Sequence, residues 1–82
     1  MTTLRPLELK AMNLAELPLQ AESPITGLVG DPIVVSRLRE LGFIRGELVR
    51  VVGRALFGEP ILVELRNATV ALRRREAECV QV

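Results

Sequence analysis

The stretch from Asp31 to Gly42 carries start and stop signals for one short helix, and it constrains the fold more than any other part of the chain. Asp31 can cap the free backbone N–H groups, and Pro32 at the first helical position has no N–H to lose. Gly42 can take the left-handed conformation that ends a helix, so that Phe43 folds back against Leu38 as in a Schellman motif. The sequence therefore predicts a helix with defined ends.

The predicted helix covers about residues 32–41 and is amphipathic. Val34, Leu38 and Leu41 recur at helical spacing, with Val35 beside them, and charged residues fall on the other side. One face of the helix is therefore expected to pack against the core.

The pattern around this helix switches to period two, which is typical of half-buried strands. Gly46 marks a turn after the helix, and Asn67-Ala68 is predicted as a tight turn because Asn tolerates positive φ. A single helical turn is expected near 74–79. The apolar residues that mark the strands are Ile25 and Leu28; Val49 and Val51; Ile61, Val63 and Leu65; Val70 and Leu72; Val80 and Val82. We therefore expect a mainly β fold, a small five-stranded barrel closed on itself with one inserted helix.

The length of 82 residues allows one domain with a thin core. Residues 1–13 mix leucines with Pro6 and charges and are interpreted as an N-terminal arm, which leaves 14–82 for the barrel. The leucines of the arm need a cover, either the barrel or a second copy. Self-association is therefore an expectation of unspecified stoichiometry.

Several classes of function are excluded by residues that are missing. The sequence has no His and no GxxxxGK[ST] motif, so nucleophilic Ser–His or Cys–His sites and a phosphate-binding loop cannot be built. We expect no enzyme activity and no required cofactor. With 11 basic and 10 acidic residues the net charge is +1, and only two residues are aromatic, so no nucleic-acid partner is expected.

The expected compartment is the cytoplasm. Cys79 is the only cysteine, which excludes an intramolecular disulfide and fits a reducing environment. No apolar run approaches the about 20 residues that span a bilayer, and the first residues lack a signal-peptide core.

Three potential metal ligands, Glu76, Glu78 and Cys79, lie close together in the sequence. Carboxylates and a thiolate can contact Fe²⁺ or Zn²⁺ weakly. The alternative is that the glutamates form ion pairs with neighbouring arginines and that Cys79 packs as a small apolar residue. No metal site is assigned on these residues.

Residues 37–46, with the sequence RLRELGFIRG, resemble the RLxELGxxxG signature of the FeoA family. Residues 55–60 and 70–77 resemble the family's hairpin tip and its ALRxxEA segment. The chain departs from the family at three turn positions, with Arg45 where a Pro is usual, Asn67 where a Gly is common, and no Gly around Ala21, where one is expected near the start of the first strand.

The resemblance implies an SH3-like barrel that acts in the bacterial cytoplasm as an accessory or regulatory protein of ferrous-iron uptake. Its implied partner is FeoB, a membrane transporter with a cytoplasmic GTP-binding domain, so that the chain would be recruited to the inner membrane face. The alternative is a barrel of the same kind that acts as a corepressor or nucleic-acid-binding module in metal-dependent transcription.

The candidate partner-binding residues are Leu56 and Phe57, which fall at the expected hairpin tip. Exposed apolar side chains at such a position mark an interface. The resemblance implies that Arg45 and Arg73 lie near the polar helix face that carries Arg37. These three arginines are therefore expected to surround the tip as a rim of hydrogen-bond donors. The alternative is that both apolar side chains fold back over an open end of the barrel.

Overall fold

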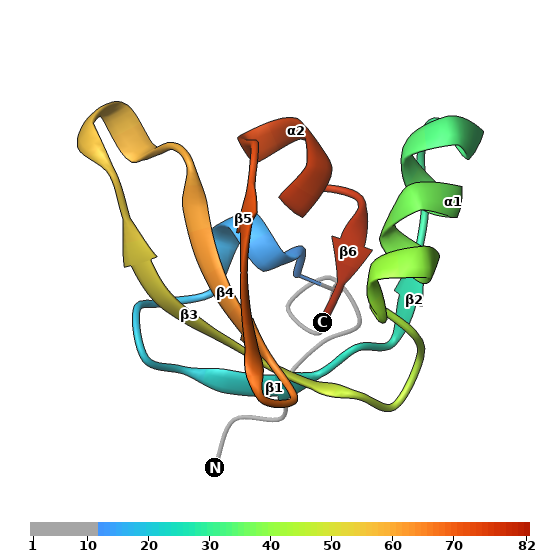
Figure 1. Cartoon of the computed structure of the whole chain (residues 1–82), viewed down its shortest axis with the longest axis horizontal. Coiled ribbons are helices and arrows are strands. Elements are labelled where there is room, and N and C mark those ends of the chain that lie inside the picture. Colours follow the sequence, from blue (N-terminus) through green and yellow to red (C-terminus); the bar gives the residue numbers. More distant parts are fainter. Residues whose placement is uncertain (1–11) are drawn as a thin grey trace, which may run out of the picture.

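The computed structural model describes residues 12–82 (Figure 1). The predicted arm over 1–13 therefore lies almost entirely outside the described residues. The elements in chain order are the 3-10 helix η1 (Leu14–Glu16), β1 (Glu22–Pro24), β2 (Gly27–Leu28), α1 (Pro32–Leu41), β3 (Leu48–Arg54), the 3-10 helix η2 (Leu56–Gly58), β4 (Ile61–Leu65), β5 (Ala68–Leu72), α2 (Arg74–Ala77) and β6 (Val80–Gln81).

The strands form two antiparallel sheets, one in the order β1-β3-β4-β5 and the other containing β2 and β6. The mainly β prediction is confirmed, but residues 12–82 contain six strands instead of the expected five, and the sheet is not closed. The expected first strand is divided, since Ile25 lies buried between β1 and β2, which pair with different partners. Because α2 follows β5, the last strand pairs with β2 instead of closing onto β5 (Figure 1).

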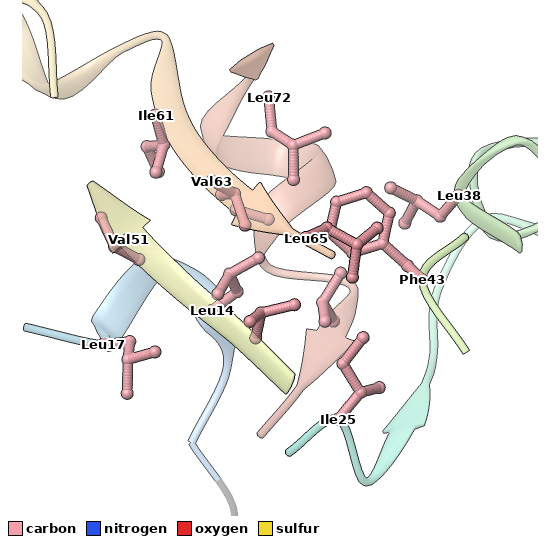
Figure 2. Close-up of a cluster of buried hydrophobic side chains, with 13 residues drawn as sticks. Leu14, Leu17, Ile25, Leu38, Phe43, Val51, Ile61, Val63, Leu65 and Leu72 are labelled. Carbon is pink, nitrogen blue, oxygen red and sulfur yellow. The ribbon is translucent and has the colours of Figure 1, made fainter. Parts of the chain in front are cut away.

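Helix α1 begins and ends at the predicted residues. Asp31 Oδ1 accepts a hydrogen bond of 2.8 Å from the Ile33 N–H. Gly42 has φ 106°, and the Phe43 N–H donates to the Leu38 carbonyl at 3.0 Å, as the Schellman motif requires. Figure 2 shows the Phe43 ring beside Leu38 in the core.

Two local predictions were wrong. Leu41 was expected in the core but is 47% exposed, because the helix buries only the narrower stripe that contains Val35 and Leu38. The tight turn consists of Arg66 and Asn67, and Ala68 already belongs to β5. The residue with positive φ is Arg66, at 58°, and not Asn67.

The core lies between the sheets and receives side chains from nearly every element (Figure 2). In β4, Ile61, Val63 and Leu65 are buried and alternate with exposed residues, as predicted. Leu14 of η1 is fully buried, so the core includes the segment before β1. No helix among residues 12–82 is long and apolar enough to cross a bilayer.

Candidate functional site

The tip of the β3–β4 hairpin projects from one end of the molecule (Figure 1). It contains η2, in which Leu56 is 82% exposed and Phe57 is 97% exposed. Both side chains therefore extend into solvent and do not fold back over an end of the barrel. The exposed Leu and Phe side chains at this tip form a small apolar patch of the kind that marks interfaces.

The backbone of Phe57 supports the view that this patch is a built feature. Phe57 has φ 64° and ψ 17°, in the left-handed region that non-glycine residues avoid. This conformation costs an L-residue roughly 1–2 kcal/mol, and the exposed ring gains no packing within the chain in return. Strain of this type is concentrated at functional sites.

Local hydrogen bonds hold the tip in shape. The Gly58 N–H donates to the Ala55 carbonyl at 3.0 Å, and the Ala55 N–H donates to the Pro60 carbonyl at 3.1 Å. A third bond connects the tip to α2, since Glu59 Oε1 accepts from the Arg74 N–H at 3.0 Å. The tip is therefore pre-organised before any partner arrives.

Arg74 is a residue of this site that sequence reasoning missed. A Cβ added to Gly58 would lie 2.9 Å from Arg74 Nη2, so the guanidinium reaches the tip itself. The Glu59–Arg74 contact joins residues that are 15 positions apart. The run of three arginines was visible in the sequence, but nothing in it showed which of them faces the hairpin.

The rim of arginines expected around the tip is only partly assembled. Arg73 caps the start of α2, next to Arg74. Arg37, however, lies on α1 and forms an ion pair with Glu76, and Figure 1 places α2 between α1 and the tip. Arg45 follows α1, in a segment at the opposite end of the molecule from the tip (Figure 1). The basic group beside the tip is therefore formed by the arginines of the α2 start.

The three potential metal ligands do not form a cluster. Glu76 is already engaged, because Arg37 pairs with its carboxylate and the Arg73 N–H donates to its Oε1 at 2.8 Å. The Cys79 thiol donates to the Arg75 carbonyl at 3.4 Å. In the part of the chain that the structure describes, no group of three such side chains could hold a metal ion.

A hollow beside β1 collects three glutamates, but each of them faces an arginine. Arg50 lies 3.4 Å from Glu22 and 3.8 Å from Glu64, across neighbouring strands. Glu47 pairs with Arg66, whose hydrogen bond and positive charge lower the pKa of the Glu47 carboxyl. These residues form an ion-paired surface that holds neighbouring elements together.

Comparisons with known proteins agree with this architecture. The family model of the FeoA domain matches residues 12–82. A fusion of Fe(2+) transport protein A with the Fe(2+) transporter FeoB, from Porphyromonas gingivalis, is 30% identical over 71 residues; these are 87% of this chain but only 8% of that protein.

Two structural relatives bear on the fold. The crystal structure of Stenotrophomonas maltophilia FeoA complexed with zinc, described as an SH3 domain protein, has a TM-score of 0.76 and 40% identity, with 85% of this chain and 87% of that chain covered. A manganese-dependent transcriptional repressor has a TM-score of 0.80 at 22% identity, with 89% of this chain and 36% of that chain covered. The second likeness shows the fold alone.

Proposed function

The chain belongs to the FeoA domain family, and from this premise we propose that it assists bacterial ferrous-iron uptake by docking onto the cytoplasmic part of a FeoB-type transporter. The observation that carries the proposal is the exposed tip formed by Leu56 and Phe57. The fusion protein of Porphyromonas gingivalis supports the choice of partner, because it joins both components in one polypeptide. The role is accessory, and the ion chemistry belongs to the transporter.

The tip has the features of a binding hot spot. Full burial of a Leu or Phe side chain gains about 1.5–3 kcal/mol, and a rigid tip loses little conformational entropy when it binds. The side chains of Arg73 and Arg74 are exposed at the start of α2, beside the tip. Within residues 12–82, neither side chain forms an ion pair with a carboxylate. We therefore expect the transporter to offer an apolar pocket bordered by carboxylates.

Binding of the full chain to the detergent-solubilised transporter of the same organism tests the proposal. We expect the double substitution Leu56→Asp with Phe57→Asp to weaken binding at least about tenfold, which corresponds to about 1.4 kcal/mol. The fold should be retained, because both side chains are outside the core.

Ile33→Asp provides a matched control, since Ile33 is 80% exposed on α1, away from the tip. This variant should bind like the wild type. If the folded double variant also binds like the wild type, the tip is not the docking site. If the wild type itself does not bind, the transporter is not the partner.

A further inference from the structure

Strand β5 forms one edge of the four-stranded sheet, and its outer side has no partner strand among the described residues (Figure 1). The other edge strand, β1, is three residues long and contains Pro24, which protects an edge from further pairing. Strand β5 has five residues, Ala68–Leu72, with neither proline nor charge among them. The two edges of this sheet are therefore unequal, and only β5 is unprotected.

The register of the β4–β5 hairpin identifies the backbone groups of β5 that point away from β4. Residues of an antiparallel pair alternate between hydrogen-bonded and non-hydrogen-bonded positions. The two-residue loop is flanked by the Leu65–Ala68 pair, which is the hydrogen-bonded type, so Thr69 and Ala71 direct their N–H and C=O groups away from β4. Both residues are exposed, and neither forms a further backbone bond within 12–82.

The charges near this edge favour an acidic partner. Strand β5 leads directly into three exposed arginines, Arg73 to Arg75, whose side chains pair with no carboxylate of the described chain. The nearest carboxylate on the neighbouring strand is that of Glu64, opposite Thr69, and it faces Arg50 at 3.8 Å. The end of β5 beside α2 therefore carries excess positive charge.

We propose that β5 binds an extended, acidic segment of a partner protein as an additional antiparallel strand. The backbone of Thr69 and Ala71 would form the ladder, and the arginines that follow would attract the acidic side chains of the segment. The edge of β5 is distinct from the Leu56–Phe57 tip, and the arginines at the start of α2 border both. The inference does not depend on docking at the tip.

Hydrogen exchange of the ¹⁵N-labelled full chain, followed by NMR, tests this proposal. The probe is a blocked six-residue peptide in which Glu and Val alternate, added at millimolar concentration. We expect exchange of the Thr69 and Ala71 amides to slow by at least about tenfold at saturation, since each gains a hydrogen bond. The same peptide with Lys in place of Glu should bind more weakly.

The substitution Ala71→Pro removes one outward N–H and leaves the hydrogen bonds to β4 intact. Edge strands accept proline at such a position, where the N–H faces away from the neighbouring strand. The substitution should abolish the slowing at Thr69. If this variant does not fold, the acidic peptide with alternate backbone nitrogens methylated removes the same hydrogen bonds from the other side. Arg75→Glu, which changes no backbone group, should weaken binding of the unmodified peptide.

Two results would overturn the proposal. In the first, the acidic peptide shifts resonances of the arginines while exchange at Thr69 and Ala71 is unchanged, which would show charge attraction without strand addition. In the second, the two amides become protected with rising protein concentration in the absence of peptide. The edge would then pair with a second copy of this chain.

Discussion

Gly42 and Phe57 both have positive φ, but only Gly42 is a residue type suited to that conformation. At Gly42 the backbone must turn to end α1, and glycine allows this without strain. At Phe57 the same backbone region places a large apolar ring in solvent. The first residue serves the fold, whereas the second reduces stability in order to display a side chain.

Replacement of Gly42 by Val should destabilise the protein by about 2 kcal/mol, because a β-branched residue at positive φ is strained. The new Cβ would also lie 3.3 Å from Leu65 Cδ2. For a domain of this size the melting temperature should fall by roughly 8–16 °C. Gly27→Ala is the control, since a Cβ at Gly27 meets nothing within 4 Å; equal melting temperatures for the two variants would contradict the prediction.

Replacement of Phe57 by Asn should increase stability slightly while weakening partner binding. Asn tolerates the left-handed region, so part of the roughly 1–2 kcal/mol of strain is relieved, and the 97% exposed ring contributes no packing. Urea unfolding of both proteins measures the first effect, and transporter binding measures the second. A marked loss of stability would mean that the Phe57 ring packs within the chain.

At the scale of elements, the sequence predicts most accurately where its signals are local. Helix α1 follows from Asp31, Pro32 and Gly42, and β4 follows from strict alternation. The division between β1 and β2 has no local signal, because it depends on which distant strand each half meets. The closed barrel was wrong for the same reason, since closure is decided by the route of the chain through α2.

The candidate site shows the same limit. Leu56 and Phe57 could be placed at a hairpin tip from the resemblance to the FeoA family. Their exposure could not be predicted, because it depends on the backbone of η2. The positions of Arg37 and Arg45 relative to the tip could not be predicted either, because they depend on how α1 packs. The Glu59–Arg74 contact also required the fold.

The ion pair between Glu47 and Arg66 connects the segment before β3 with the β4–β5 turn. The hydrogen bond from Arg66, together with its charge, lowers the pKa of Glu47 below the usual 4.5. A lowered carboxyl pKa adds stability above the unfolded-state value, and this stability is lost as the pH falls through the folded-state value. Arg66 itself stays charged throughout, because its pKa is raised.

The stability difference between wild type and Glu47→Gln should therefore be present at pH 7 and disappear as the pH falls below about 4.5. The effect should be small, as is usual for exposed pairs. Thermal unfolding of both proteins from pH 7 to pH 3 measures it. Glu40→Gln, which removes a carboxylate without a hydrogen bond in the described chain, is the control. A difference that grows at low pH would contradict the assigned sign.

At the scale of the whole molecule, the two surfaces that we propose for partners are the hairpin tip and the edge of β5, and the arginines at the start of α2 border both. The tip lies at one end of the hairpin, and the free edge lies along β5 (Figure 1). Small domains of this length have little core to spare for a ligand cavity. An accessory role through surface contacts fits these proportions better than a role through an enclosed site.

A deletion strain should take up less ⁵⁵Fe²⁺ than its parent when ferrous iron is limiting. The wild-type chain should restore uptake, and so should Ile33→Asp, whereas the double substitution at Leu56 and Phe57 should not. Equal protein levels, checked by immunoblot, exclude an effect of degradation. Normal uptake in the deletion strain would rule out the transport role.

The first and last described residues lie together, because the Val82 N–H donates to the Met12 carbonyl at 2.9 Å and Asn13 forms a bridge with Gln81. Chain segments that continue from Met12 and from Val82 therefore depart from one place, and neither needs to disturb the hairpin tip. Such a tether converts docking into an intramolecular event, with a local concentration in the millimolar range for short flexible linkers. A contact too weak to persist between separate proteins would then remain occupied most of the time.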